Sequence, residues 1–288
     1  MRTELRSAEP GTAVAMSTGP APFALRPSPF RILSGLLALV LLVGGVWSFV
    51  AFARRPAVDR TWERVTPSGV LRVAIDPTFP PFASGPADNP IGYDADLARL
   101  LAERLGLGVV FVPTPFDNLY DALRTGAADA TISALTVRPE ELSQVRYSRP
   151  YLEAGARILV RADAPWTDLA DLAGQTVGAE LGSDGDLAAR SLARRLPELR
   201  VDSSFESGDA ALAALLDGRL AGAAFDGVTA LTLLNARPEL RALPSPDPAP
   251  LVVALPRDAA ILQARVDEVL AELAADGTLD ELARRWFR

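Results

Sequence analysis

Carboxylates, arginines, tyrosines and hydroxyls are the side chains with which this sequence could carry out acid–base, nucleophilic or ionic chemistry. Its 288 residues include no Cys and no His, and all 29 basic residues are Arg. The absence of Cys and His excludes disulfides, the usual zinc sites, and the Ser-His-Asp and Cys-His arrangements of many hydrolases. The absence of Lys excludes a Schiff-base nucleophile. We therefore expect no metal and no cofactor.

The charge balance narrows the possible partners. The formal net charge is -7 at neutral pH. An acidic protein repels the phosphate backbone of nucleic acids, and no basic stripe interrupts the sequence. We therefore expect no DNA or RNA partner.

The N-terminal part differs from the rest in composition. Residues 1–31 are rich in Pro, Gly, Ala and Ser, which predicts a flexible leader. Residues 32–53 carry no charge, and as a helix they would be about 33 Å long, enough to cross a ~30 Å hydrocarbon core. Ala51-Phe52-Ala53 also fits a signal-peptide cleavage site, although the apolar stretch is longer than such peptides need. We expect an uncleaved transmembrane anchor, a linker over 54–68, and the remainder outside the cytoplasm.

Helical and extended patterns alternate after this linker, which is typical of an α/β protein with ligands at the carboxyl ends of its strands. The first series predicts strands at 70–75, 109–112 and 129–133 and helices at 93–105 and 118–123. The second predicts strands at 158–160, 176–180, 200–203, 222–225 and 251–255, with helices at 186–196, 209–216, 228–235, 259–274 and 279–287, and a short helix after Trp166. Two series followed by a late return predict two lobes joined by more than one crossing.

Five segments carry a resemblance to a known family, and they occur in the family's order and spacing. They are LRVAIDPTFPPF (71–82), IGYDADLARLLAERLG (91–106), ADATISALTVRPEE (128–141), YSRPY (147–151) and ADGTLDELARRWF (275–287). The sequence is similar to the extracytoplasmic solute-binding proteins, family 3, that deliver polar amino acids to ABC transporters. The resemblance implies a two-lobed periplasmic-binding-protein fold of type II, with lobe 1 at 69–154 plus 251–288 and lobe 2 at 155–250.

The family's pocket positions can be transferred one at a time. Asp76 and Asp226 stand where family carboxylates meet the ligand ammonium, and Phe79 stands where an aromatic face covers the ligand. The other matching positions line the mouth, close the pocket or contact the ligand through hydroxyl or backbone groups: Phe82, Phe116, Ser133 and Thr136.

Two positions depart from the family's pattern. The Arg that grips the ligand α-carboxylate is replaced by Glu141, and a Thr at a second-lobe helix N-terminus is replaced by Asp184. Two acids would repel a carboxylate placed between them.

Three explanations remain open. The ligand is an organic cation without an α-carboxylate; or a shifted Arg, with Arg138 or Arg146 nearest in sequence, replaces the missing one; or the site is degenerate and the protein is a sensor or scaffold. Glu141 and Asp184 can also be solvated surface acids, with Asp184 capping the helix that follows.

The expected function is that of the substrate-binding component of an ABC importer. Such a protein would be a monomer that binds an amino acid or organic cation between hinged lobes and docks on a membrane permease. The alternatives are a sensor domain, or a carboxylate-based dehydratase or hydrolase on the same fold with Glu141 as the general acid or base.

Overall fold

The computed structural model describes residue 42 and residues 59–287. The predicted leader, and apart from residue 42 the predicted anchor over 32–53, lie outside these residues. Within the described part, no helix is long and apolar enough to cross a membrane. By its contacts the chain divides into two units, Met1–Pro56 and Ala57–Arg288, and the fold described below belongs to the second.

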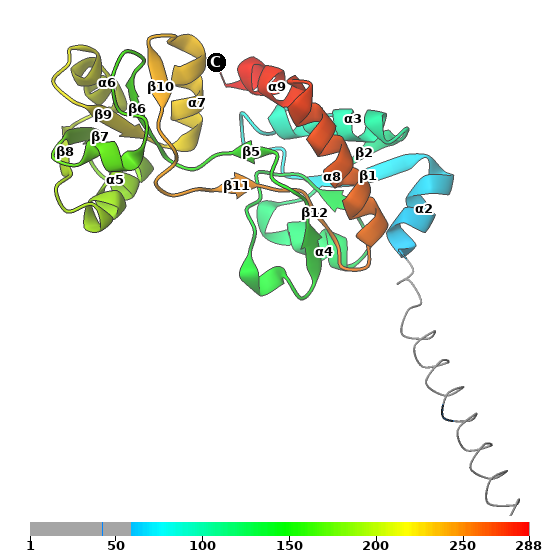
Figure 1. The fold of residues 1–288 in the computed structure, drawn as a ribbon. Helices are drawn as coiled ribbons and strands as arrows, with labels where there is room; N and C mark the ends of the chain where they lie inside the picture. Colours follow the sequence, from blue (N-terminus) through cyan, green and yellow to red (C-terminus); the bar gives the residue numbers. More distant parts are fainter. Residues whose placement is uncertain (1–41, 43–58, 288) are drawn as a thin grey trace, which may run out of the picture. The chain divides into compact units, whose positions relative to one another are not determined.

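The first lobe is built on a five-stranded sheet with the order β2-β1-β3-β12-β4 (Figure 1). Strand β1 pairs in parallel with β2 and β3, whereas β12 pairs antiparallel with β3 and β4. The strands span Val70–Ile75 (β1), Gly108–Pro113 (β2), Ala130–Thr131 (β3), Val145–Tyr147 (β4) and Ala254–Pro256 (β12).

Helices cover both faces of this sheet, because β1 is apolar on both sides. Val73 and Ile75 pack into the core formed with α3, α8 and α9, and Ala74 packs into the core formed with α4. The helices of this lobe are Arg60–Ser68 (α2), Tyr93–Arg104 (α3), Leu119–Arg124 (α4), Ala260–Ala275 (α8) and Thr278–Trp286 (α9), with 3-10 turns at Phe116–Asn118 and Pro139–Glu141.

The second lobe has its own five-stranded sheet, with the order β10-β6-β9-β7-β8. Strand β7 is parallel to β8 and β9, and β6 is antiparallel to β9 and β10. The strands span Arg157–Arg161 (β6), Thr176–Glu180 (β7), Arg200–Phe205 (β8), Gly222–Phe225 (β9) and Leu240–Ala242 (β10).

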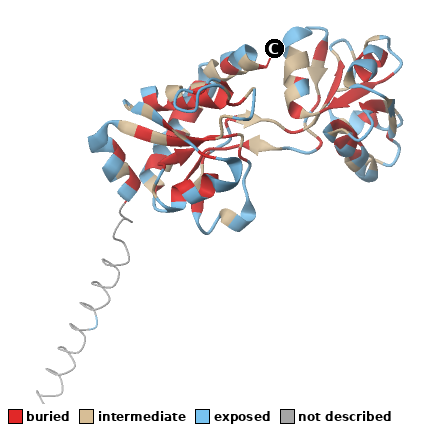
Figure 2. Ribbon diagram, turned by 180° about the vertical axis from the view of Figure 1, so that it is seen from behind, coloured by how far each residue is buried: buried red, intermediate tan, exposed pale blue. Residues whose placement is uncertain are grey.

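The helices of the second lobe also lie on both faces of its sheet. Helix α5 packs on one face with Ile158 and Val177, and helices α6 and α7 pack on the other with Leu159 and Ala223. These helices are Asp184–Arg195 (α5), Gly208–Leu216 (α6) and Gly227–Ala236 (α7), and a 3-10 turn occupies Leu169–Leu172. Figure 2 shows the buried residues concentrated in the two sheets and on the helix faces turned toward them.

The lobes are joined by two chain segments that pair with each other. Strands Leu152–Glu153 (β5) and Pro250–Leu251 (β11) form a two-stranded antiparallel sheet between the two larger ones. The predicted two-lobed α/β architecture with more than one crossing is therefore confirmed.

Two expectations about individual elements were wrong. Residues 60–68, predicted as part of a linker, form helix α2, which is capped by Asp59 and buries Val65 in the first-lobe core. Asp59 also accepts hydrogen bonds from the N–H groups of Ile261 and Leu262, so α2 is tied to the start of α8. The single strand predicted at 251–255 is two strands, β11 and β12, because the chain leaves one sheet and enters the other.

Candidate functional site

A cavity of about 460 Å³ is lined by residues of both lobes, and we call it the cleft cavity. The first lobe contributes Phe79 and Phe82 from the loop after β1, and Ala134 from the loop after β3. The second lobe contributes Asp184, the first residue of α5, and Asp226, the residue that caps α7. The cleft cavity therefore combines two aromatic rings from one lobe with two carboxylates from the other.

A second cavity of about 350 Å³ shares Phe79 and Ala134 with the cleft cavity. It is also lined by Asp76, Thr78 and Phe116, and we call it the aromatic cavity. Phe79 is 49% exposed and Phe116 is 39% exposed, so both rings present a free face. Phe79 is held from behind by Phe82, with ring centroids 5.4 Å apart in a stacked arrangement. Such faces can cover an aliphatic chain or a cation.

Asp76 fixes the two loops that carry these aromatic rings. One carboxylate oxygen accepts hydrogen bonds from the backbone N–H and the hydroxyl of Thr78, at 3.0 and 2.6 Å. The other oxygen accepts from the backbone N–H of Phe116 at 3.0 Å. The N–H of Asp76 donates to the hydroxyl of Ser133 at 3.1 Å, which places Ser133 directly behind the pocket. Asp76 thus shapes the aromatic cavity as well as supplying charge to it.

The second-lobe acids differ in how their carboxylates are used. Asp226 accepts a hydrogen bond from the backbone N–H of Thr229 at 2.9 Å and caps helix α7. Helix α5 is capped by Ser183 and not by Asp184, because the Ser183 hydroxyl accepts from the N–H of Asp186 at 3.1 Å. The side chain of Asp184 makes no hydrogen bond or ion pair with any other residue that the structure describes. Its charge is free to act on a ligand.

The predicted first-lobe residues near the missing Arg lie outside both cavities. Thr136 pairs with Leu251 through a β-bridge. The guanidinium of Arg138 lies over the ring of Tyr120, 5.7 Å from its centroid. Glu141 accepts a hydrogen bond from Arg124 of helix α4 at 3.0 Å. None of the three predicted residues lines the cleft cavity or the aromatic cavity.

The other Arg considered as a replacement is also occupied elsewhere. Arg146 donates to the backbone carbonyl of Arg257 at 2.6 Å and to the side-chain oxygen of Gln263 at 3.2 Å. Both contacts hold it against the start of helix α8. Neither cavity is lined by an arginine.

A third cavity, of about 500 Å³, adjoins the cleft cavity on the far side of Asp184. It follows one face of helix α5 to Arg190 and Arg194, and Asp247 lies across from them. Arg190 is bound to Asp186 at 2.8 Å. Two basic side chains of α5 therefore line the cavity that adjoins the cleft cavity beyond Asp184.

Sequence reasoning missed a buried group that supports the loop after β3, which lines both cavities. Asp94 in helix α3 is fully buried and accepts hydrogen bonds from the hydroxyl of Tyr151 at 2.9 Å and from the N–H of Ala134 at 2.6 Å. Burial raises the pKa of Asp94 to about 7, and the two hydrogen bonds oppose this shift. Ala134 has a φ of 47°, a strained value for a residue with a side chain. The helical spacing of Asp94 with Leu97 and Leu101 indicates this burial, since it places the acid on the apolar face.

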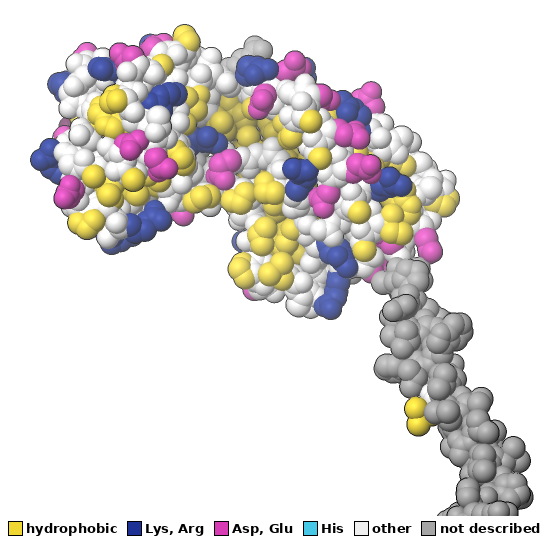
Figure 3. Space-filling view, in the orientation of Figure 1, with side chains coloured by type: hydrophobic (Ala, Val, Ile, Leu, Met, Phe, Trp, Pro, Cys, Tyr) yellow, Lys and Arg dark blue, Asp and Glu magenta, His cyan; other side chains and the backbone are white. Residues whose placement is uncertain are grey.

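The charges around the site favour a cation. Three carboxylates and two exposed aromatic faces line the two joined cavities, without a basic side chain among them. Elsewhere on the surface, Figure 3 shows acidic and basic side chains interspersed. Within the described part of the chain, no three acidic side chains come together in a way that would hold a metal ion.

Two α/β lobes, joined by paired crossings and enclosing a lined cavity, define the class of hinged solute-binding proteins. Residues 71–288 match the bacterial extracellular solute-binding proteins, family 3, and the chain belongs to this family.

Three relatives illustrate its place in the family. The chain is 29% identical to ABC transporter arginine-binding protein 1 of Escherichia coli (strain K12), over 75% of this chain and 90% of that protein. It is 31% identical to a solved ancestral cationic amino acid solute-binding protein, with a TM-score of 0.53, covering 79% of this chain and all (100%) of that one. It is 26% identical to a solved ancestral cyclohexadienyl dehydratase, with a TM-score of 0.66, covering 80% and 97%.

Proposed function

We propose that this protein is the substrate-binding component of an ABC importer and that its ligand is a small organic cation held between the two lobes. The observation that carries the proposal is the lining of the cleft cavity, where Asp184 and Asp226 face aromatic rings and no arginine is present. A cation gains from both carboxylates and from the face of Phe79, whereas a carboxylate would be repelled.

The names of two relatives also indicate a positively charged ligand. The relative from Escherichia coli is named as an arginine-binding protein, and one ancestral structure is named for cationic amino acids. We infer that this chain keeps the preference for a cationic group and has lost the first-lobe grip on the α-carboxylate, because Glu141 is paired with Arg124.

We further propose that the site binds its ligand and does not transform it. One of the similar solved structures is an ancestral cyclohexadienyl dehydratase, so a dehydratase is the enzymatic alternative to consider. Glu141, the acid considered as a general acid or base, lies outside both cavities in an ion pair with Arg124. A proton-transfer group must lie within hydrogen-bond reach of the reacting atom, and this position does not offer that.

The location and assembly follow from the same proposal. We propose that residues 32–53 anchor a monomer at the extracytoplasmic face of the membrane, and that a permease there accepts the ligand. The proposed lobe boundaries are 69–154 plus 251–288 for the first lobe and 155–250 for the second. These agree with the sheet strands, which fall at 70–147 and 254–256 in one lobe and at 157–242 in the other.

A comparison of arginine with two analogues tests the proposed ligand class. Agmatine keeps the guanidinium of arginine but lacks the carboxylate, and citrulline keeps the carboxylate but has a neutral side chain. We expect agmatine to bind at least as tightly as arginine and citrulline not to bind, measured by calorimetry and thermal shift on the full chain. A ligand at 100 times its Kd adds about 2.7 kcal/mol of stability. Arginine binding tenfold tighter than agmatine would contradict the proposal.

Asp226→Asn tests whether the carboxylate of Asp226 contributes to ligand binding. Asn is as good a helix cap as Asp, so α7 should keep its stability while the charge is lost. We expect agmatine affinity to fall about 10- to 100-fold, as for other hydrogen bonds to charged groups. Asp209→Asn is the matched control, since Asp209 is an exposed acid in the first turn of α6 and lines neither cavity. An equal loss in both variants would show a general charge effect and not a binding contact.

A further inference from the structure

Asp94, near the start of α3, contacts both of the first-lobe loops that line the cleft cavity. Its carboxylate accepts a hydrogen bond from the N–H of Ala134, which lines both cavities, at 2.6 Å. Its backbone N–H donates to the carbonyl of Phe82, which lines the cleft cavity, at 2.9 Å. One fully buried residue therefore holds a loop on each side of it.

The turn at Ala134 needs this support. Its φ of 47° lies in the left-handed region, which costs a residue with a side chain free energy that the surroundings must offset. A hydrogen bond to a charged acceptor is about twice as strong as one between neutral groups. The charged form of Asp94 therefore stabilises the turn more than the protonated form does.

The turn is also connected to the rest of the lining. The residue before it, Ser133, accepts a hydrogen bond from the N–H of Asp76 at 3.1 Å. Asp76 in turn accepts from the N–H of Phe116, which lines the aromatic cavity with it, at 3.0 Å. A shift of the turn at Ala134 therefore moves a charged and an aromatic side chain of the lining.

The surroundings of Asp94 place its titration near neutral pH. Burial raises its pKa to about 7. Within the described part of the chain, the ionisable groups that act on its carboxyl are Tyr151, from the segment before β5, and Tyr93 of its own helix, on which Asp280 of α9 also acts. Burial raises the pKa of both tyrosines, so both stay neutral while Asp94 titrates.

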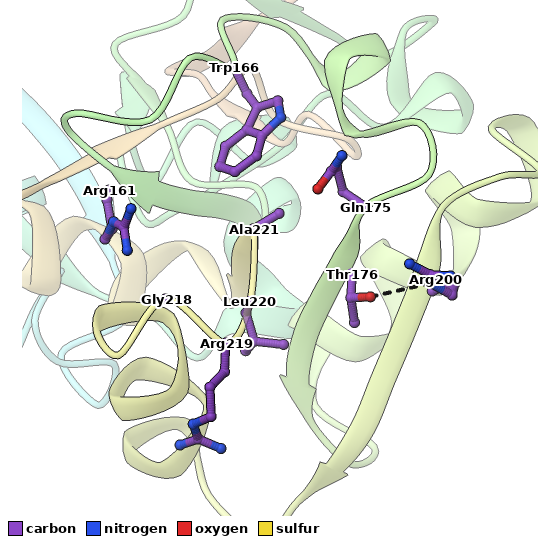
Figure 4. Close-up of a pocket in the computed structure, with 9 residues that line it drawn as sticks. All are labelled: Arg161, Trp166, Gln175, Thr176, Arg200, Gly218, Arg219, Leu220 and Ala221. Carbon is purple, nitrogen blue, oxygen red and sulfur yellow. Dashed lines mark hydrogen bonds between the residues drawn. The ribbon is translucent and has the colours of Figure 1, made fainter.

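The rest of the sequence leaves this pH range clear. The 288 residues include no His and no Cys, the side chains that ordinarily titrate between pH 5 and 9, and carboxyl groups in ordinary surroundings titrate near pH 4. A second-lobe cavity of about 210 Å³, shown in Figure 4, is lined by Arg161, Arg200 and Arg219 and by no acid, and arginine keeps its charge throughout. A change in affinity between pH 6 and 8 therefore points to Asp94 or to the α-amino group.

We propose that Asp94 is a positioning residue that makes ligand affinity depend on pH. Charged Asp94 holds the turn at Ala134 in the form that lines both cavities. Protonation weakens this hydrogen bond, the turn relaxes from its left-handed conformation, and the ligand binds more weakly. The inference rests on the proposed function in one respect, namely that the ligand occupies these cavities.

Calorimetry with agmatine between pH 6 and 8 measures this dependence on the full chain. The amine and the guanidinium of agmatine both stay charged over this range. We expect affinity to rise about tenfold with pH and binding to release a proton, seen as different heats in buffers of different ionisation enthalpy. Asp94→Asn should bind weakly and equally at each pH. Glu103→Gln, which removes an exposed acid from the same helix, is the matched control and should keep the rise.

Ala134→Gly distinguishes a turn held in place from a charge that acts through space. Glycine adopts a φ of 47° without strain, so the turn no longer needs a charged acceptor and affinity should stay high down to pH 6. An unchanged pH dependence in Ala134→Gly would overturn the positioning role. Tyr151→Phe keeps the hydrogen bond to Ala134 and should move the rise in affinity to higher pH, which tests the proposal if Asp94→Asn folds poorly.

The backbone amide signal of Ala134 in the NMR spectrum tests the same contact without ligand. We expect this signal to titrate near pH 7 in the wild type and not in Asp94→Asn. Agmatine binding with the same affinity from pH 6 to 8, or an Ala134 signal that does not titrate, overturns the inference and leaves the proposed function intact. If agmatine does not bind, the proposed ligand class is wrong, and the pH series is run with arginine. If arginine does not bind either, the proposed function and this inference both fail.

Discussion

Asp94 links the loop after β3, which lines both cavities, to the segment that leads into the paired crossings β5 and β11. One of its oxygens accepts from Ala134, which lines both cavities, and the other accepts from Tyr151, which directly precedes β5. The charged form of Asp94 is favoured by both donors and opposed by burial. Protonation of Asp94 therefore changes both the hydrogen bonds that hold this loop and the stability of the fold.

We expect Asp94 to make unfolding depend on pH in a defined window. Its pKa is about 7 in the folded protein and 3.8 without the fold. The folded state thus holds a proton that the unfolded chain releases between these values. The stabilisation of the folded state by this proton is complete below about pH 4, falls as pH rises, and is lost above about pH 7. Denaturant unfolding of Asp94→Asn across this range should lack that fall, whereas Glu103→Gln, an exposed acid on the same helix, should keep it.

Tyr151→Phe should move the same window. Removing the hydroxyl that donates to the charged carboxylate raises the pKa of Asp94 further, so the loss of stability should extend above pH 7. If the free energy of unfolding falls with pH in the same way in the wild type, in Asp94→Asn and in Tyr151→Phe, the role of Asp94 is refuted.

At the residue scale, Asp226 and Phe79 were taken as pocket residues from the family resemblance, and both line the cleft cavity because each lies just after a strand end. Their contact with a ligand stays a prediction. The ion pair of Glu141 with Arg124 was not predictable, because it depends on where helix α4 packs. The burial of Asp94 was indicated by helical spacing, but its partners come from segments 40 and 57 residues away.

At the scale of elements, the start of helix α7 is packed tightly against the hinge. A Cβ on Gly227 would lie 1.8 Å from the carbonyl oxygen of Ala154, which adjoins β5. Such overlap with backbone forces the helix start and the hinge segment apart. Asp226, the adjacent cap, would move with the helix.

We therefore expect Gly227→Ala to lower the free energy of unfolding by about 1–3 kcal/mol, the usual cost of overpacking. Agmatine affinity should fall as well, because Asp226 is displaced. Gly208→Ala is the matched control: Gly208 also begins a helix, α6, but its nearest neighbour would be an ordinary 3.5 Å away. Calorimetry measures the stability and the agmatine affinity of both variants. Equal losses in Gly227→Ala and Gly208→Ala would show a general effect of replacing glycine and not an effect of the contact with Ala154.

The elements themselves were largely predictable, with a few exceptions. Alternating apolar runs predicted most strands and helices of both sheets, but not the three-residue edge strands β4 and β10. Helix α2 was missed because its pattern is mostly polar and contains Pro67, and its stability comes from burying Val65 and from the contact of Asp59 with α8. The separation of β11 from β12 was missed because an apolar run does not reveal which sheet each part joins.

At the scale of the molecule, the end of the chain closes the core of the first lobe. Phe287 is fully buried, with its ring centroid 5.6 Å from that of Phe82 and 5.5 Å from that of Tyr93. The residue thus packs against segments roughly two hundred positions earlier in the sequence. Local pattern predicted helix α9 but not this packing.

We expect Phe287→Ala to lower the free energy of unfolding by about 3–5 kcal/mol, as for other buried aromatic residues. Hydrogen exchange should accelerate in the strands of the first lobe and stay slow in β6 to β10. Phe116→Ala is the control, since that ring is 39% exposed and its loss should cost little without ligand. Uniform acceleration across both sheets would show that the lobes unfold as one unit.

The order of strands in the first sheet also governs how the chain folds as it is synthesised. Strand β12 lies in the interior of that sheet, between β3 and β4, but the second lobe is inserted in the chain ahead of it. On the ribosome, the inserted lobe can complete its sheet while β4 still has no partner strand and β3 has only one. Such unpaired edges invite aggregation. In the first sheet these edges stay without their partner until β12, Ala254–Pro256, has been synthesised.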